Sequence, residues 1–364
     1  MNKLANILVC PLRAGESLLP TSPRSFPGKH LTITGHDMSI PGSEQDHVRV
    51  LMWCTPRSNS TVFTKCLSFV PESQIFFEPY GYCYSFLDKL RAAGISVDLE
   101  SSEPYKHVSD DMWQKLMATV PADLAEPSTV DHNMFMYPHI KMMLDNPDPS
   151  KKVIFVKDMA YGIVNSTQFL PDSLSNYRFA FLIRHPIRVF SSWKRAVLNI
   201  HAVLKQGRAK NSEASKEGIT KASEAFHVGN DTVSWYNAPG LFYKELYDLW
   251  TIVMQRYDPN PVVVDSDDLV SDPSTVLPKF CQKLGIPYSD ALLKWDGSSD
   301  IIDNWIFGCI KPNDCMKVNC DAAFNSTCFK GSSPMPSFES LAPDIKECVQ
   351  RTMPYYLKMY SWKI

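Results

Sequence analysis

The sequence contains short, continuous apolar runs separated by segments whose apolar residues recur at helical spacing. The runs lie at residues 48–53, 74–77, 152–156, 179–183 and 261–264. Continuous apolar runs are typical of strands that are buried on both faces, and helical segments between such strands indicate parallel crossovers. We therefore predict an α/β fold with a central, mainly parallel sheet flanked by helices.

Differences in composition divide the chain into regions. Residues 1–46 are rich in proline, serine, glycine and histidine and show little periodicity, which predicts an irregular N-terminal extension. We expect residues 47–364 to form a single domain. Within it, residues 205–232 are polar and charged and contain almost no core residues. This stretch is predicted to be an insertion, either a solvated excursion or a mobile lid.

The overall charge gives no general attraction for nucleic acid. The formal net charge is −2 at pH 7 and the pI is near 6.5, so any anion site must be local. We expect no membrane span, because no apolar run is long enough. The first residues make a poor signal peptide, since Pro11 and Arg13 interrupt their short apolar piece. We expect a cytoplasmic protein, with a secretory compartment as the alternative.

The first strand leads directly into a polar turn at residues 55–61, and a helical pattern follows it. In a turn of small hydroxyl residues at the start of a helix, several backbone N–H groups point to one place. The helix dipole adds partial positive charge there. Arg57 adds a guanidinium group whose fork suits oxyanions. The turn is therefore predicted to bind a phosphate or sulfate, although it lacks the Gly-Lys-Ser or Gly-Lys-Thr of a Walker A loop.

Charged residues follow three further strands. Glu78 stands between the second strand and Pro79, and Arg184 follows the fourth strand. Lys157 and Asp158 follow the third strand and are expected to cap its end. Ligands of open α/β sheets bind outside the carboxyl ends of the strands. We therefore expect these side chains to gather beside the polar turn.

In this order the segments resemble the sulfotransferases that use 3′-phosphoadenosine 5′-phosphosulfate (PAPS). The turn after Pro56 resembles their 5′-phosphosulfate loop. Its residues here are Arg57, Ser58, Asn59, Ser60 and Thr61. Arg184 and Ser192, in the helix after the fourth strand, resemble the 3′-phosphate site of the family. Lys330 and Gly331 resemble the late turn that closes over the 3′-phosphate.

The resemblance covers about residues 48–358 and implies a P-loop-like sulfotransferase architecture. It also implies transfer of a sulfonate group from PAPS to a hydroxyl or amine of a small-molecule acceptor, with release of the bisphosphate PAP. Arg57 and Lys157 would stabilise the leaving oxygen, and no metal is expected because these cations supply the countercharge. Glu78 is the candidate base for the acceptor's proton, and Asp158 is the reserve candidate.

The sequence departs from the family pattern in two places. Many cytosolic members have a catalytic histidine two residues after the lysine that corresponds to Lys157, and Met159 stands there instead. Members with a glutamate just after the second strand resemble this chain more closely, through Glu78. The family's tryptophan that packs on adenine is replaced by Val62. The residues that stack on adenine therefore stay open.

Two other functions stay open at this point: a module that binds the nucleotide without turnover, and a nucleotide-dependent kinase on a related fold. The acceptor cannot be read from the sequence. Aromatic and methionine residues are dense between residues 80 and 143. Either core packing or a partly apolar acceptor pocket explains them. The sequence leaves the oligomeric state open.

The chain has 10 cysteines. Four of them lie in apolar runs and are expected to be small core residues: Cys54, Cys66, Cys83 and Cys281. Four others cluster near the end of the chain: Cys309, Cys315, Cys320 and Cys328. Their spacing lacks the close pairs typical of zinc sites. Free thiols are the leading expectation for this cluster, with disulfides or a metal site as alternatives.

Overall fold

The computed structural model describes residues 47–92, 94, 132–208, 227–229, 240–307 and 320–364. The predicted N-terminal extension, residues 1–46, lies outside these ranges. Cys309, Cys315 and most of the predicted insertion at residues 205–232 also lie outside them. The first residues of that insertion are helical, because the helix that begins at Pro186 runs to Arg208.

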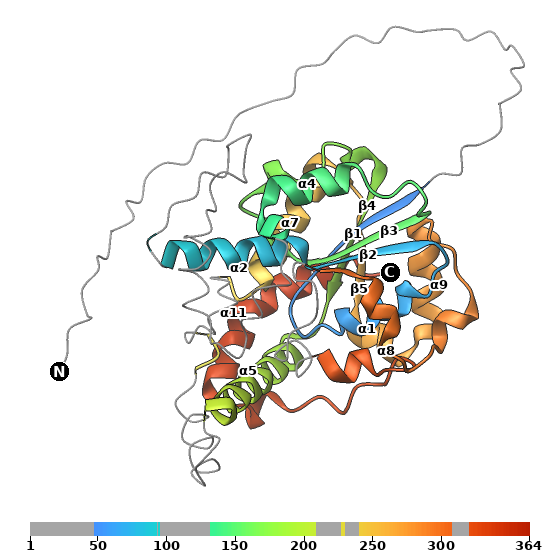
Figure 1. The fold of residues 1–364 in the computed structure, drawn as a ribbon. Coiled ribbons are helices and arrows are strands. Elements are labelled where there is room, and N and C mark those ends of the chain that lie inside the picture. The colour runs from blue at the N-terminus through green and yellow to red at the C-terminus, as the bar shows by residue number, and fades with distance from the viewer. Residues whose placement is uncertain (1–46, 93, 95–131, 209–226, 230–239, 308–319) are drawn as a thin grey trace, which may run out of the picture. The chain divides into compact units, whose positions relative to one another are not determined.

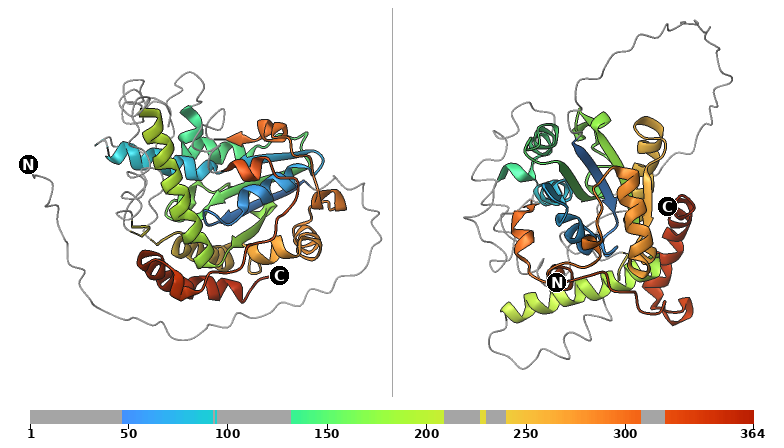
Figure 2. Two further views of the ribbon diagram at one scale, coloured as in Figure 1. Left: turned by 90° about the horizontal axis from the view of Figure 1, so that it is seen from below. Right: turned by 90° about the vertical axis from the view of Figure 1, so that its right-hand side faces the viewer.

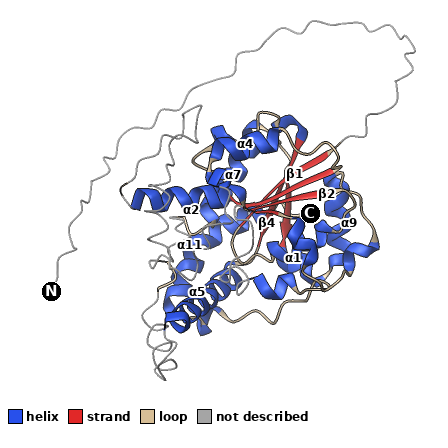
Figure 3. Cartoon of the chain, in the orientation of Figure 1, coloured by secondary structure: helices blue, strands red, loops and turns tan. Residues whose placement is uncertain are grey.

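A six-stranded parallel sheet forms the centre of the described chain (Figure 3). Its strands are β1 (Val48–Cys54), β2 (Ser73–Phe77), β3 (Val153–Met159), β4 (Tyr177–Ile183), β5 (Val262–Asp265) and β6 (Ile306–Phe307). They lie in the order β5-β4-β1-β3-β2-β6, and every neighbouring pair is parallel. The predicted α/β fold with a central parallel sheet is confirmed. β6 has no counterpart among the predicted strands, because so short a strand carries no recognisable pattern.

Helices cover both faces of the sheet (Figure 1). They include α1 (Ser60–Ser68), α2 (Pro79–Ala92), α4 (Tyr137–Asp145), α5 (Pro186–Arg208), α7 (Tyr243–Arg256), α8 (Ser266–Ser271), α9 (Pro273–Leu284) and α11 (Pro343–Tyr360). α1 packs against β2 and β3, α7 against β4, and α9 against β5. α5 and α11 lie side by side (Figure 2), and Lys194 Nζ forms an ion pair with Asp344 Oδ2 over 2.8 Å between them. No helix in the described ranges is long and apolar enough to cross a membrane.

β3 is longer than its apolar run. The sequence predicted that Lys157 and Asp158 cap the end of this strand, whereas the structure includes both in β3, which ends at Met159. Both side chains are fully buried. Buried charges are tolerated when they are paired or hydrogen-bonded, and the partners of these two come from the segment that follows β2. The sheet therefore fixes the position of both side chains.

The segment after β5 contains a short helix that the sequence did not indicate. Asp265 ends β5 and caps α8, because its carboxylate accepts the backbone N–H groups of Asp267 and Asp268. Asp272 then caps α9 by accepting the N–H of Thr275. The two capped helices follow each other directly, which holds the acidic residues of α8 in place.

The described aromatic and methionine residues between 80 and 143 belong mostly to the core. Tyr80, Phe86 and Met134 are buried. The Tyr137 ring stacks on the rings of Tyr80 and Phe169, with centroids 6.0 and 5.2 Å away. These contacts favour core packing over an acceptor pocket as the explanation for this region.

Candidate active site

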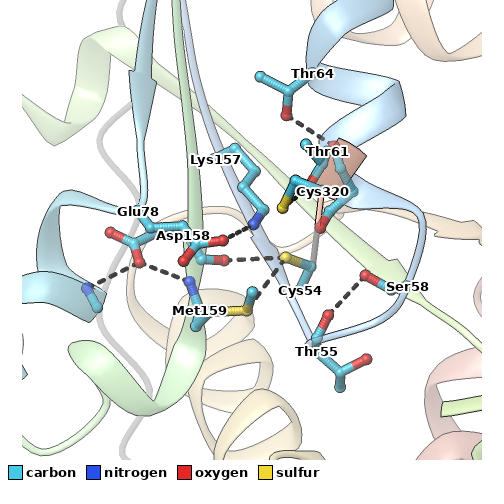
Figure 4. Close-up of polar contacts among 12 residues, drawn as sticks. Cys54, Thr55, Ser58, Thr61, Thr64, Glu78, Lys157, Asp158, Met159 and Cys320 are labelled. Atoms are coloured by element: carbon cyan, nitrogen blue, oxygen red, sulfur yellow. Dashed lines mark hydrogen bonds and ion pairs between the residues drawn. The ribbon is translucent and has the colours of Figure 1, made fainter. Parts of the chain in front are cut away.

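The carboxyl ends of the central strands meet at one edge of the sheet. β1 and β3 end in register at Cys54 and Met159, and β2 pairs with β3 at Phe77 and Lys157. The segments that follow these strands therefore emerge side by side, and a cavity of about 300 Å³ lies among them. Figure 4 shows this edge, with residues from β3, from the turn after β1 and from the C-terminal part of the chain.

The cavity brings together most of the residues that the sequence predicted for the site. Its lining includes Arg57, Asn59, Ser60, Thr61, Glu78, Lys157, Arg184, Ser192 and Lys330. The other predicted residues adjoin lining residues in the chain but do not line the cavity themselves: Ser58, Asp158 and Gly331. Segments that are far apart in the sequence thus meet at one cavity.

The turn at residues 55–61, which we call the anion loop, has two residues in the left-handed conformation and an internal hydrogen bond. Arg57 and Asn59 both have φ = 61°, in the left-handed region. The Ser58 hydroxyl donates to the Thr55 carbonyl over 2.7 Å. α1 begins at Ser60, and the residue before it makes no side-chain cap. The first N–H groups of α1 are therefore available to an anion at the cavity.

Two arginines at the cavity are linked through the anion loop. Arg57 Nε donates to Ser192 Oγ over 3.0 Å, and Arg184 Nη1 donates to the Arg57 carbonyl over 2.7 Å. Burial lowers the pKa of both guanidinium groups, yet arginine keeps its charge in proteins. Arg57 at the anion loop is thus linked directly to both Arg184 and Ser192 at the cavity.

Glu78 and Lys157 form a largely buried ion pair at the end of β2. The Lys157 ammonium group donates to Glu78 Oε1 and lies 4.4 Å from the centre of the Phe77 ring. Burial disfavours this ammonium group, but the Glu78 carboxylate, together with Cys54 and Cys320, raises the pKa of Lys157. The Glu78 side chain is 11% exposed and borders the cavity. A molecule in the cavity can therefore reach the carboxylate.

Asp158 lies beneath the turn that carries Glu78. Its carboxylate accepts three backbone N–H groups, from Tyr80 at 2.6 Å, Gly81 at 3.0 Å and Met159 at 2.7 Å. Burial raises the pKa of Asp158 to about 8, against the effect of these donors. Glu78 has φ = 55°, a left-handed conformation that costs free energy unless the surroundings hold it. The geometry of Asp158 therefore suits holding this turn.

One wall of the cavity, residues 320–330, is anchored by a buried lysine for which the sequence predicted no role. Lys65 lies on α1 and is fully buried. Its ammonium group donates to the carbonyl oxygens of Phe324 at 2.5 Å and Ser326 at 2.9 Å. The signal in the sequence was a lysine inside an apolar helical segment, because lysine is rarely fully buried without partners.

A second missed residue is Asp267, on α8. It forms ion pairs with Arg184 and Arg188 and accepts a hydrogen bond from Ser332. The sequence offered no signal for it, because nothing there distinguishes Asp267 from the adjacent Asp268.

The cysteines that the structure describes are free thiols. The four predicted core cysteines, Cys54, Cys66, Cys83 and Cys281, are buried, and so is Cys348. Cys320 and Cys328 border the cavity, and Cys320 Sγ lies 3.9 Å from Thr61 Oγ1. Burial raises the pKa of the Cys320 thiol. Over the described ranges, no three histidine, cysteine or acidic side chains gather in a way that could hold a metal ion.

Comparison with known proteins gives a family match in the C-terminal part of the chain. Residues 253–362 match a family model described as a sulfotransferase domain. Sulfotransferase ppzF of Metarhizium majus (strain ARSEF 297) is 24% identical over 149 residues, which is 41% of this chain and 39% of that protein. Sulfotransferase ppzF of Metarhizium rileyi (strain RCEF 4871) is 25% identical over 154 residues, which is 41% of each chain. The chain matches about two fifths of the length of these curated relatives.

Two solved structures are also similar to the chain. One is a sulfotransferase domain from the curacin biosynthetic pathway, with a TM-score of 0.38 and 12% identity, over 84% of this chain and 97% of that chain. The other is retinol dehydratase in a complex with retinol and PAP, with a TM-score of 0.33 and 13% identity, over 85% of this chain and 81% of that chain. The chain is thus similar to sulfotransferases, through the family model that matches residues 253–362 and through the curated relatives.

Proposed function

We propose that this protein transfers the sulfonate group of PAPS to a hydroxyl or amine of a small-molecule acceptor and releases PAP. The observation that carries the proposal is that two anion-binding corners and a carboxylate border one cavity. The anion loop with Arg57 forms one corner, and Arg184, Ser192 and Lys330 form the other. PAPS carries anionic groups at both its 3′ and 5′ positions and therefore needs two such corners.

The two ends of PAPS would be held by different chemistry. The first N–H groups of α1, together with Arg57, suit the 5′-phosphosulfate, because helix N-termini and guanidinium groups stabilise oxyanions. Arg184 and Lys330 supply two cations for the 3′-phosphate, and Ser192 adds a hydroxyl donor. The nucleotide is then fixed at both ends, which places its sulfur near Glu78 and Lys157.

Sulfonate transfer forms one bond to sulfur and breaks another. The acceptor's oxygen or nitrogen attacks the sulfur, and its proton passes to Glu78. The bond between sulfur and the bridging oxygen breaks, and its electron pair stays on the 5′-phosphate. Arg57, Lys157 and the N–H groups of α1 stabilise that developing charge. Protonation of Glu78 removes the charge that Lys157 faces, so the ammonium group is freed to interact with the leaving oxygen.

The acceptor side of the cavity is proposed to be partly apolar. Met159 and Trp193 are among the apolar lining residues. Trp193 packs against Phe242 with 5.5 Å between the ring centroids, which fixes the indole ring beside the cavity. Rigid apolar walls with a few polar groups are typical of small-molecule sites. Because Met159 cannot accept a proton, activation of the acceptor falls to Glu78.

Turnover of PAPS tests this proposal. PAPS is incubated with the protein and a panel of aliphatic alcohols, phenols and amines in the presence of EDTA, and PAP and sulfated products are quantified. We expect PAP and a sulfated product to form in equal amounts. Binding of PAP without turnover across the panel would favour a nucleotide-binding module. Magnesium-dependent consumption of ATP, with PAPS left intact, would favour a kinase.

A further inference from the structure

Asp267 joins three parts of the chain behind the cavity. Its Oδ1 lies 3.5 Å from Arg184 Nε and its Oδ2 lies 3.1 Å from Arg188 Nε. The Ser332 hydroxyl donates to Asp267 Oδ1 over 2.9 Å. Arg184 follows β4, while Ser332 comes just after Lys330 in the C-terminal part of the chain. One carboxylate therefore contacts the segments that carry both cations of the 3′-phosphate corner.

We propose that Asp267 is a positioning residue for the 3′-phosphate corner and determines the selectivity of the protein for a phosphate at the 3′ position. This inference rests on the proposed function. Asp267 does not line the cavity, so it acts through the residues it holds. Its role is to fix Arg184 from behind and to tie the turn at Lys330 to the same point.

The geometry of Arg184 supports this role. Its guanidinium group is held on one side by the Arg57 carbonyl, at 2.7 Å, and on another by the Asp267 carboxylate. A guanidinium group has five N–H donors in a rigid plane, so the hydrogen bond to Arg57 together with the ion pair to Asp267 limits the directions of the remaining donors. Arg184 also lines the cavity, which leaves its remaining donors able to meet an oxyanion there.

The helix that carries Asp267 is held by its neighbours. Asp265 caps α8 and accepts a hydrogen bond from the Tyr356 hydroxyl over 3.0 Å. Ser266, the first residue of α8, accepts a hydrogen bond from Asn59 Nδ2 over 2.8 Å. α8 therefore contacts the anion loop through Ser266 and Arg184 through Asp267. The spacing between the two anion corners is set by this helix, which makes selectivity for one position of the phosphate possible.

A competing effect acts in the opposite direction. Asp267 is negatively charged, so its removal raises the positive potential of the corner and favours any anion. The positioning role predicts that PAP binding weakens without Asp267, whereas the charge effect alone predicts that it strengthens. Two isomers with the same charge separate these effects. PAP and adenosine 2′,5′-bisphosphate differ only in the position of one phosphate, so charge alone changes both affinities equally.

The experiment is calorimetric titration of both isomers into wild type, Asp267→Asn and Asp268→Asn, without added metal. Asp268 is the matched control, because it carries the same charge on the same helix but pairs with Lys363 instead. We expect wild type to bind PAP at least about tenfold more tightly than the 2′,5′ isomer, or about 1.4 kcal/mol. Asp267→Asn should bring this ratio to about threefold or less through weaker PAP binding, and Asp268→Asn should keep it.

Each outcome decides a different point. A selective wild type together with an equally selective Asp267→Asn would overturn this inference and leave the proposed function intact. A wild type that bound both isomers equally would overturn the proposed 3′-phosphate corner and this inference with it. Ser332→Ala provides a second test that leaves all charges in place, and it should weaken PAP binding by about threefold. Unchanged PAP affinity in a folded Ser332→Ala would overturn the proposed tie between Asp267 and the turn at Lys330.

Discussion

Glu78 and Lys157 bind each other through both backbone and side chain. The Glu78 N–H donates to the Lys157 carbonyl over 2.7 Å, and the Lys157 ammonium group donates to the Glu78 carboxylate. The backbone bond extends the pairing of β2 with β3 beyond Phe77. The sheet thus fixes the backbone of the candidate base while its carboxylate stays at the cavity.

Replacement of Glu78 by glutamine keeps the shape of the side chain and removes its basicity. We expect Glu78→Gln to lower kcat by about a hundredfold or more, the usual effect of losing a general base. The affinity for PAP should change by less than about threefold, because no phosphate ligand is lost. Glu72→Gln, in an exposed ion pair with Lys152, is the control and should keep wild-type turnover. A fully active Glu78→Gln would assign the base to another group.

Arg184→Ala tests the 3′-phosphate corner. PAP and AMP differ only by the 3′-phosphate, so their comparison isolates that group. We expect the variant to bind PAP at least about tenfold more weakly, or about 1.4 kcal/mol, and AMP within about threefold of wild type. Arg178→Ala, at an exposed position of the same strand, should leave both affinities unchanged. Equal losses for both nucleotides would mean that Arg184 supports the cavity as a whole.

Asp158 should make stability depend on pH. Its pKa in the folded protein, about 8, lies above the ordinary value of 3.8. Between these values the folded state keeps a proton that the unfolded chain has lost, so the contribution of Asp158 to stability falls as pH rises. The quantity to compare is the free energy of unfolding of wild type minus that of Asp158→Asn. We expect this difference to be smaller at about pH 8 than at about pH 5. Urea denaturation at both pH values measures this difference.

The three backbone donors around Asp158 favour its ionised form, so they act against the predicted dependence of stability on pH. If they keep the carboxylate ionised throughout, the difference between wild type and Asp158→Asn will be the same at both pH values. The variant should in either case be less stable by about 1–3 kcal/mol, because an amide nitrogen cannot accept the N–H groups that the carboxylate binds. Full stability of Asp158→Asn would contradict its role beneath the Glu78 turn.

Lys65→Met should loosen the wall formed by residues 320–330. It removes the donor to the carbonyl oxygens of Phe324 and Ser326, in a buried setting. We expect a loss of about 1–3 kcal/mol in the free energy of unfolding, together with weaker PAP binding. Lys279→Met, exposed on α9, is the control. A stable Lys65→Met with wild-type affinity for PAP would mean that the wall holds without this anchor.

Bound PAP should protect two cysteines from alkylation. Cys320 and Cys328 border the cavity, whereas Cys281 is buried in the core. Burial raises the pKa of Cys320, so its reaction with iodoacetamide should be slow near neutral pH and faster at alkaline pH. Mass spectrometry should show less labelling of Cys320 and Cys328 with PAP present, and no labelling of Cys281 under either condition. Identical labelling with and without PAP would argue against PAP in this cavity.

The sheet, and most of the residues that line the candidate site, were predictable from the sequence. Parallel strands buried on both faces need continuous apolar runs, and these runs mark β1 to β5. Residues directly after such runs must lie at one edge of the sheet, which is why Glu78 and Arg184 were expected near the anion loop. Pro79 helped further, because it marks the end of β2 and the start of α2.

Other features depend on contacts that the sequence does not display. From the sequence, Lys157 was expected at the end of its strand. A lysine inside a buried strand is stable only with a partner, which here is Glu78. That partner is supplied by the register of β2 and β3, which the sequence does not display. Asp267 and Asp268 are equivalent in the sequence, and only the packing of α8 gives them different partners. The wall anchored by Lys65 depends on contacts between residues that are 259 and 261 positions apart in the chain, which no local pattern encodes.

The most direct test of this account is calorimetric titration of the wild-type protein with PAP and with AMP, in EDTA. The cavity predicts micromolar or tighter binding of PAP and at least about tenfold weaker binding of AMP, a difference of about 1.4 kcal/mol. Equal affinity for the two nucleotides, or no binding of PAP, would contradict the assignment of Arg184, Ser192 and Lys330 to the 3′-phosphate.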